Sequence, residues 1–290
     1  MPLALARRLL SCAVRSSWYG AFVLDLGKRS LLGVAISAID YDAATTHLVD
    51  AAQNRHAFAA SALAVHGVMT AARDLGYRDE FNRLDFAAPD GQPVRWALNL
   101  LHGTALPDRV YGPALMGRVL ASLAEKGLPI YLYGSRSIVL NTLIPKLQER
   151  YPGLVIAGSE PGQYRTARPD ELRGIATRIT RSGARFVFVG LGCPRQEIFA
   201  ANLRPLLNVP LLGVGAAFDY HAGLLRRPPV LFQRAGLEWL WRLTLEPRRL
   251  WRRYVLLNPA YVALVTLQSL GLWRPAAKHS RPSTKPTVEV

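Results

Sequence analysis

Cysteine is scarce in this chain, and long uncharged runs are scarce as well. The 290 residues include only two cysteines, Cys12 and Cys193, with no Cys-x-x-Cys pair and no cysteine–histidine ligand spacing. A disulfide scaffold and a structural zinc site are therefore disfavoured, and a reducing compartment fits. Most of the chain lacks repeated charge-free spans, which excludes a polytopic membrane protein. Arg15 interrupts the short N-terminal apolar run, so we expect no signal peptide.

Acidic residues are also few. Lys and Arg number 36 against 20 Asp and Glu, which gives a formal charge of +16. Residues 1–29, 226–253 and 274–290 carry +4, +6 and +3 of it, and the long middle carries only +3. Because the middle of the chain has an ordinary net charge and the basic residues gather near the ends, we expect the basic segments to contact nucleic acid or anionic lipid. Since half of the residues are apolar, the chain is not disordered throughout.

Short apolar segments alternate with helical spacing along the middle of the chain. We expect strands at 32–39, 56–64, 86–91, 129–134, 154–158, 185–190 and 209–215, and helices at 42–53, 65–75, 96–101, 138–151, 169–182 and 195–203. This alternation predicts an α/β fold, with a Rossmann-like, mostly parallel sheet and helices on both faces. Such sheets bind ligands beyond the C-terminal ends of their strands.

Composition divides the chain into four parts. We expect a basic N-terminal arm (1–29), an α/β domain (30–225), an Arg/Trp-rich helical appendage (226–273) and a disordered tail (274–290).

The appendage contains a basic amphipathic stretch, 237–254, which is typical of a helix at a membrane interface. The alternative is a helix that packs its tryptophans on the domain. Residues 255–273 carry no charge, but Asn258-Pro259 favours an interfacial or self-packed helix over a membrane span. The expected membrane contacts are Trp239, Trp241, Arg242, Arg248, Arg249, Trp251, Arg252 and Arg253.

Several expected strands end in turns that suit a ligand. Glycines in Gly134-Ser135, Gly190-Leu-Gly192 and Gly213-Val-Gly215 permit close backbone approach, and a following helix N-terminus can face a diphosphate. Neither Gly-x-Gly-x-x-Gly nor a Walker A loop is present, so NAD and P-loop sites are disfavoured. Phe218 and Asp219 suit a nucleoside, although a core phenylalanine and an N-cap explain them equally well.

Two other motifs carry charge. Asp90 in Pro-Asp-Gly ends an apolar strand, where a general base would lie; an ordinary turn is the alternative. Arg109 in Arg-Val-Tyr-Gly offers a cation for a phosphate. Cys193 has no evident histidine partner, so we interpret it as a small buried thiol rather than a nucleophile.

Taken in order, the motifs resemble those of the WecG/TagA/CpsF glycosyltransferase family, from about residue 31 to about residue 255. The resemblance implies an inverting, metal-independent and cofactor-free transfer of a sugar from a UDP-sugar to a polyprenyl-diphosphate-linked saccharide. The motifs that carry it are Leu32-Gly-Val34, Pro89-Asp-Gly91, Arg109-Val-Tyr-Gly112, Tyr131-Leu-Tyr-Gly134, Gly190-Leu-Gly-Cys-Pro-Arg-Gln-Glu197 and Gly213-Val-Gly-Ala-Ala-Phe-Asp219.

The resemblance also implies residue roles. Asp90 matches the family's catalytic base, Arg109 an arginine that engages the diphosphate or acceptor, and Gln196 a glutamine that lines the active site. The expected substrate contacts are Ser61, His66, Gly134, Ser135, Gly190, Gly192, Arg195, Gly215, Phe218 and Asp219.

One departure from the family bears on the substrate. Many members carry Thr-x-Asn on the strand before Pro-Asp-Gly, whereas this chain has Ser61 and Leu63, with His66 as a possible substitute. The departure suggests a hexose-type exopolysaccharide transferase rather than an N-acetylmannosaminyl enzyme.

Two other classes of function stay open. A basic nucleic-acid-binding protein would use the charged ends, but the arginines alternate with Trp and Leu and no such motif is present. A non-catalytic UDP-sugar-binding regulator would not need both Asp90 and Gln196. We therefore expect no nucleic-acid partner, and expect a peripheral enzyme on the cytoplasmic face of the inner membrane, possibly as a homo-oligomer.

Overall fold

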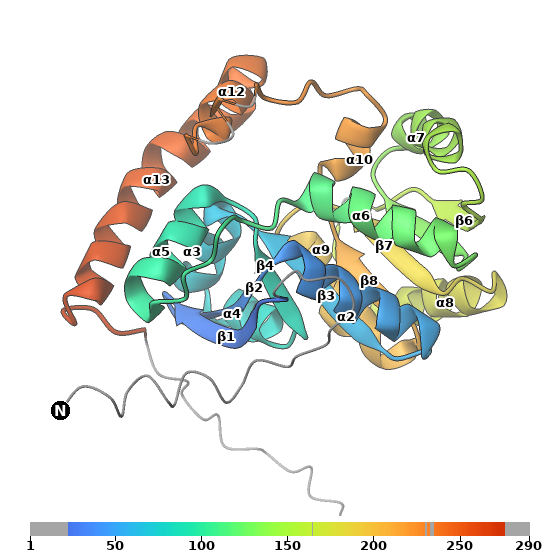
Figure 1. Cartoon of the computed structure of the whole chain (residues 1–290), viewed down its shortest axis with the longest axis horizontal. Helices are drawn as coiled ribbons and strands as arrows, with labels where there is room; N and C mark the ends of the chain where they lie inside the picture. The colour runs from blue at the N-terminus through green and yellow to red at the C-terminus, as the bar shows by residue number, and fades with distance from the viewer. Residues whose placement is uncertain (1–22, 164, 230, 233–234, 276–290) are drawn as a thin grey trace, which may run out of the picture.

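A computed structural model describes residues 23–163, 165–229, 231, 232 and 235–275 (Figure 1). Its central sheet has six strands in the order β4-β3-β8-β7-β5-β6. Every pair of neighbours is parallel, which confirms the expected α/β fold. The strands are β3 (Phe58–Leu63), β4 (Phe86–Pro89), β5 (Ile130–Gly134), β6 (Ile156–Glu160), β7 (Phe186–Gly190) and β8 (Pro210–Gly213).

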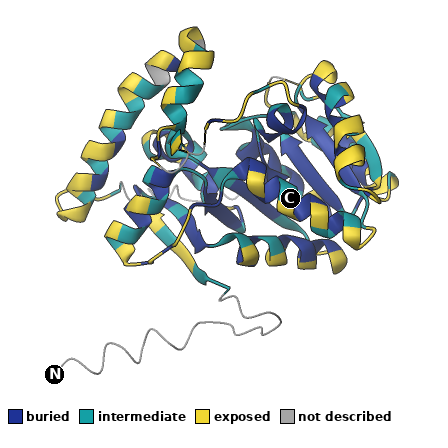
Figure 2. Cartoon of the chain, turned by 45° about the horizontal axis from the view of Figure 1, so that its top comes forward, coloured by how far each residue is buried: buried dark blue, intermediate teal, exposed yellow. Residues whose placement is uncertain are grey.

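Helices cover both faces of this sheet, as expected. Along β7 the alternation is plain, because Phe186 and Phe188 enter one buried cluster while Val187 and Val189 enter another. Both faces of the inner strands are buried, as Figure 2 shows in dark blue, whereas the edge strand β6 is partly exposed. The first face is covered by α2 (Tyr41–Gln53), α6 (Gly112–Glu125), α7 (Ser137–Arg150) and α10 (Ala217–His221), and the second by α8 (Pro169–Arg181) and α9 (Arg195–Leu203).

The N-terminal hairpin corrects one expectation. The strand expected at 32–39 is β2 (Val34–Ile39), and it pairs with β1 (Asp25–Leu31) in a separate antiparallel sheet. Leu32 and Gly33 both have positive φ, 51° and 82°, which is the backbone of a two-residue hairpin turn. The boundary expected at residue 30 therefore falls inside β1, because the pairing of β1 depends on a partner that its own polar sequence does not reveal.

The C-terminal segment forms two helices, and the boundary between them lies inside the amphipathic stretch expected at 237–254. They are α12 (Glu238–Leu245) and α13 (Pro247–Ser269), and α13 continues through residue 254 without a break. Helix α13 packs on α3 (Val65–Arg73) and α5 (Gln92–His102), where it buries Tyr261 and Val265 (Figure 1). The Tyr261 hydroxyl donates a hydrogen bond to the Pro93 carbonyl at 3.0 Å.

Some elements and segments differ from the expectations or lie beyond them. Helices α4 (Leu75–Asn82) and α6 and the short 3₁₀ helix Arg204–Leu206 have no counterpart among the expected elements. Residues 1–22 of the expected arm and 276–290 of the expected tail lie outside the described residues. Within the described part of the chain, no helix is long and apolar enough to cross a membrane.

Candidate active site

A large pocket lies where the strands of the sheet end. It has a volume of about 1650 Å³ and is lined by the loops after β3, β4, β5, β7 and β8, and by α12 and α13. Typical small-molecule pockets have about 300–1,000 Å³. The pocket therefore has room for two substrates at the sheet edge where α/β proteins bind their ligands.

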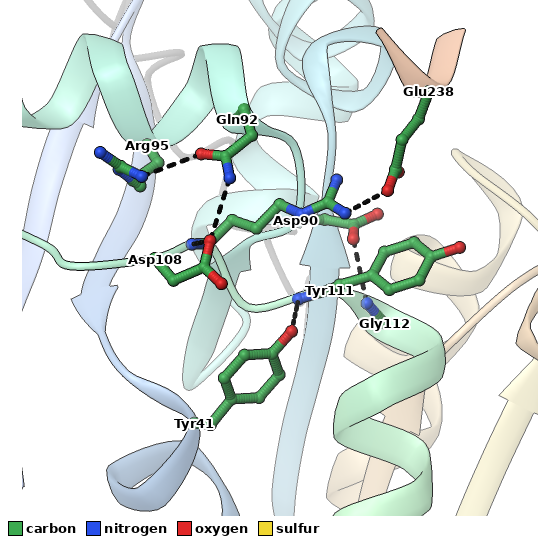
Figure 3. A network of polar contacts seen from close by, with 9 residues as sticks. Tyr41, Asp90, Gln92, Arg95, Asp108, Tyr111, Gly112 and Glu238 are labelled. Carbon is green, nitrogen blue, oxygen red and sulfur yellow. Dashed lines mark hydrogen bonds and ion pairs between the residues drawn. The ribbon is translucent and has the colours of Figure 1, made fainter. Parts of the chain in front are cut away.

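Asp90 stands at the pocket directly after β4. Its backbone N–H donates to the Leu63 carbonyl of β3 at 3.1 Å, and its carboxylate accepts a 2.9 Å hydrogen bond from the N–H of Gly112, the first residue of α6 (Figure 3). Burial raises the pKa of Asp90 to about 6, although the charge of Arg109 and the Gly112 hydrogen bond oppose the rise. A carboxylate with this pKa is suited to accept a proton near neutral pH.

Arg109 lies beside Asp90 and is almost completely buried. Its guanidinium forms an ion pair with Glu238 of α12 and lies 4.6 Å from the centre of the Tyr111 ring. The side chains of Arg109 and Glu238 are only 7% and 15% exposed. Burial lowers the pKa of Arg109, but the hydrogen bond and charge of Glu238 outweigh burial and leave that pKa raised. Arg109 is therefore a fixed cation beside the proposed base.

Helix α12 brings a second cation, Arg242, to the side of the pocket that carries Asp90 and Arg109. We call this side the charged wall. Arg242 lines the pocket, lies 3.4 Å from the Glu246 carboxylate, and lowers the pKa of Asp90 through its charge. Tyr220 also lines this region, and its ring meets that of Tyr111 edge to face at 6.3 Å. The wall thus combines two arginines with aromatic rings, an arrangement that can bind a diphosphate.

Beneath the turn after β7 lies a buried polar network. The Gln196 amide accepts a hydrogen bond from the Gly192 N–H at 3.2 Å and donates to the Glu197 carboxylate at 2.8 Å. The Ser61 hydroxyl donates to the same Glu197 oxygen at 2.6 Å. Glu197 has no exposed surface, and burial raises its pKa against the lowering effect of these hydrogen bonds. The network fixes the turn that would face a donor diphosphate.

Comparison with known proteins identifies the family. The model of the glycosyl transferase WecG/TagA/CpsF family matches residues 29–275. The chain belongs to this family. A relative from Bacillus spizizenii, an N-acetylglucosaminyldiphosphoundecaprenol N-acetyl-beta-D-mannosaminyltransferase, is 33% identical over 235 residues, which cover 81% of this chain and 84% of the relative. The protein is therefore a glycosyltransferase, as the resemblance implied.

The structure brings most of the expected site residues of this glycosyltransferase together. The pocket is lined by Asp90, Arg109, Gln196, His66, Ser135, Gly190, Gly192, Arg195, Gly215 and Asp219. Gln196 is 3% exposed and both ends of its amide are hydrogen-bonded within the protein, which makes it a positioning residue more than a substrate contact.

Three expected substrate contacts do not line the pocket. Phe218 is completely buried in the core and packs against Gly190, so its position matches the core alternative that the sequence left open. Ser61 is also fully buried and belongs to the Glu197 network. Gly134 is buried against the backbone of Gly190. All three residues are buried beneath the residues that line the pocket and support them.

The expected membrane contacts separate into three groups. Trp239 and Arg242 line the pocket, and the Trp241 ring lies edge to face with Phe232 at 5.9 Å, so these side chains do not simply face outward. Arg248 and Trp251 are exposed on α13. Arg249, Arg252 and Arg253 belong to α13, but their side chains lie outside what the structure describes.

One triplet, Asp40-Tyr41-Asp42, has the Asp-x-Asp spacing that can supply carboxylates to a divalent cation. The structure uses both carboxylates elsewhere. Asp40 caps α2 by accepting from Ala43 N, and Asp42 pairs with Arg118 at 2.7 Å. Neither residue lines the pocket.

Sequence reasoning missed several residues of the site. Glu238 was counted as part of a basic membrane helix, and Tyr220 and Glu197 received no role. Their positions depend on contacts across the chain, since Ser61 and Glu197 are 136 residues apart and Arg109 and Glu238 are 129 apart. The available signal was the presence of two acids, Glu238 and Glu246, in an otherwise basic segment.

Proposed function

We propose that the protein is an inverting, metal-independent glycosyltransferase that moves a hexose-type sugar from a UDP-sugar to a polyprenyl-diphosphate-linked saccharide. The observation that carries the proposal is Asp90, a carboxylate with a pKa of about 6 at the end of β4, beside the buried cation Arg109. Asp90 would accept the proton of the acceptor hydroxyl as its oxygen attacks the anomeric carbon and UDP departs from the opposite side.

The departing diphosphate needs a positive environment. Arg195 begins α9, and the Gly190–Gly192 turn precedes it, so that backbone N–H groups and a guanidinium can face the donor. Arg109 and Arg242 lie on the other wall and suit the acceptor's diphosphate. On the donor side, the Arg195 guanidinium and the backbone N–H groups would take the place of a metal ion in stabilising the charge of the departing UDP.

Leu63 bears on the identity of the donor sugar. Leu63 lines the pocket where many family members have an asparagine, so the wall offers no amide to an N-acetyl group at that point. This favours a hexose and a role in exopolysaccharide synthesis. The second candidate is N-acetylmannosamine, which the Bacillus relative transfers.

Membrane association would place the enzyme at its lipid acceptor, on the cytoplasmic face of the inner membrane. Support comes from exposed basic and apolar side chains on α13, among them Arg248, Trp251 and Leu256. Replacing Trp251, which is 47% exposed, with Glu should weaken cosedimentation with anionic vesicles. Ile138→Glu, at an exposed site on α7, is the control, and equal loss in both variants would contradict a specific role for α13.

The deciding experiment measures transfer from a panel of UDP-hexoses and UDP-N-acetylmannosamine to a synthetic polyprenyl-diphosphate-saccharide. We expect Asp90→Asn to lose about 10²–10⁴-fold in rate while it retains UDP binding. Asp108→Asn is the matched control, because the exposed Asp108 lies close by but does not line the pocket. Full transfer by Asp90→Asn would show that another group is the base. Absence of transfer to every acceptor despite UDP binding would favour a non-catalytic UDP-sugar-binding regulator, and absence of UDP binding would favour a nucleic-acid-binding protein.

A further inference from the structure

The pocket extends beyond its charged wall along α13. Val255, Asn258, Pro259 and Val262 of α13 line this extension, and Val65 at the start of α3 lines it as well. We call this part of the pocket the α13 groove. It is continuous with the wall that carries Arg109, Tyr111 and Arg242, because all of these residues line one pocket.

Packing of the helix does not account for the apolar side chains of the groove. Helix α13 buries a different set of residues, including Tyr261 and Val265, against the domain. Val255 and Val262 remain 56% and 63% exposed although they line the pocket. Apolar side chains held open to water beside a binding site are typical of a surface that an apolar ligand covers.

The groove and the charged wall together define the polarity of the ligand. Arg109 and Arg242, each paired with a glutamate, suit a diphosphate, and the uncharged groove in the same pocket suits a hydrocarbon attached to it. The volume of about 1650 Å³ leaves room for such a chain besides a nucleotide sugar.

We propose that the α13 groove binds the first isoprene units of the acceptor lipid while the acceptor's diphosphate lies at Arg109 and Arg242. This inference rests on the proposed function, since it assumes a polyprenyl diphosphate acceptor. The groove would hold the first isoprene units outside the bilayer. It would thereby set the position of the acceptor's sugar hydroxyl relative to the Asp90 carboxylate. Recognition would then include the hydrocarbon next to the diphosphate, and the bilayer would hold only the remainder of the chain.

A binding experiment on the full chain in vesicle-free solution tests the groove without requiring activity. The probes are radiolabelled farnesyl diphosphate and dimethylallyl diphosphate, with 15 and 5 carbons, measured by equilibrium dialysis below the concentration at which farnesyl diphosphate aggregates. One buried methylene contributes about a fourfold gain in affinity. We therefore expect farnesyl diphosphate to bind at least about tenfold more tightly than the shorter probe. Equal affinities would overturn the proposal.

A matched pair of variants locates the hydrocarbon. Val262→Trp fills the groove, whereas Leu256→Trp adds the same bulk at a site on α13 that is 62% exposed and does not line the pocket. We expect Val262→Trp to lose most of the preference for farnesyl diphosphate and Leu256→Trp to keep it. Equal effects of the two variants on farnesyl diphosphate binding, or an effect of Val262→Trp on vesicle cosedimentation alone, would show that α13 only anchors the enzyme.

Transfer assays separate this inference from the function on which it rests. With acceptors that carry either a long lipid or a single isoprene unit, Val262→Trp should raise KM for the long acceptor at least about tenfold more than for the short one. Transfer by the wild type with equal KM changes for both acceptors would refute the groove and leave the proposed function intact. Absence of transfer to every acceptor would refute the proposed function, and the groove proposal with it.

Discussion

Arg109 and Glu238 form a buried ion pair between the α/β domain and helix α12, although 129 residues separate them in the sequence. The pair lies beside Asp90, whose pKa both charges influence in opposite directions. Helix α12 therefore contributes to the electrostatics of the site itself. Under the proposed function, this contact would make the C-terminal segment part of the catalytic site as well as a surface for lipid.

The pH dependence of activity should report this arrangement. Asp90 must be ionised to accept a proton, so kcat/KM should fall about tenfold per pH unit below its pKa of about 6. Arg109→Gln removes a charge that lowers this pKa and should move the acid limb to higher pH. Glu238→Gln removes a charge that raises it and should move the limb to lower pH. If neither substitution shifts the pH at which kcat/KM falls, a group other than Asp90 controls the loss of activity at acid pH.

The stability of the protein should also depend on the ion pair. Glu238→Gln leaves the Arg109 charge buried with a weaker partner, and we expect a loss of about 1–3 kcal/mol in the free energy of unfolding. Denaturant unfolding measures the loss. Glu80→Gln breaks the exposed pair with Arg83 and serves as the control, with an expected change below about 1 kcal/mol. Equal changes in both variants would mean that the buried pair contributes no more than a surface pair.

Glu197 should act as the organiser of the Gly192 turn. Glu197→Ala removes the acceptor for both Ser61 and Gln196 in a fully buried environment, and we expect a loss of about 1–3 kcal/mol in stability. Because Gln196 holds Gly192, KM for the UDP-sugar should rise as well. Glu149→Ala, at an exposed site on α7, should change neither quantity. An unchanged KM for the UDP-sugar would show that the Glu197 network does not contribute to donor binding.

Gly190 should tolerate no side chain. A Cβ atom there would lie 2.6 Å from the Phe218 ring, which is completely buried, so we expect Gly190→Ala to destabilise the protein by about 1–3 kcal/mol. Gly174→Ala in α8 is the matched control, because its Cβ meets only the end of the Arg178 side chain at 3.4 Å. That substitution should stabilise the helix by up to about 1 kcal/mol. Thermal unfolding of the two variants compares them, and a neutral Gly190→Ala would contradict the tight packing of Phe218.

Chelation should leave transfer unchanged. Four carboxylates line the pocket, those of Asp90, Asp219, Glu238 and Glu246, but among the described residues no three His, Cys, Asp or Glu side chains gather as metal ligands. The carboxylates of Asp40 and Asp42 are engaged at the start of α2. We expect the rate with EDTA to equal the rate with added Mg²⁺ or Mn²⁺. A strict requirement for either ion would contradict the metal-independent mechanism.

The sequence by itself determined the parallel α/β architecture, since buried strands such as Phe186–Gly190 are short apolar runs whose neighbours follow helical spacing. It also located Asp90, Arg109 and the glycine turns, because motif order and strand ends are local properties. Only the tertiary structure decided that Phe218 belongs to the core, that residues 25–31 pair with β2, and that Glu238 meets Arg109. The reason is physical: burial and ion pairing depend on which distant segments meet, and neither composition nor periodicity carries that information.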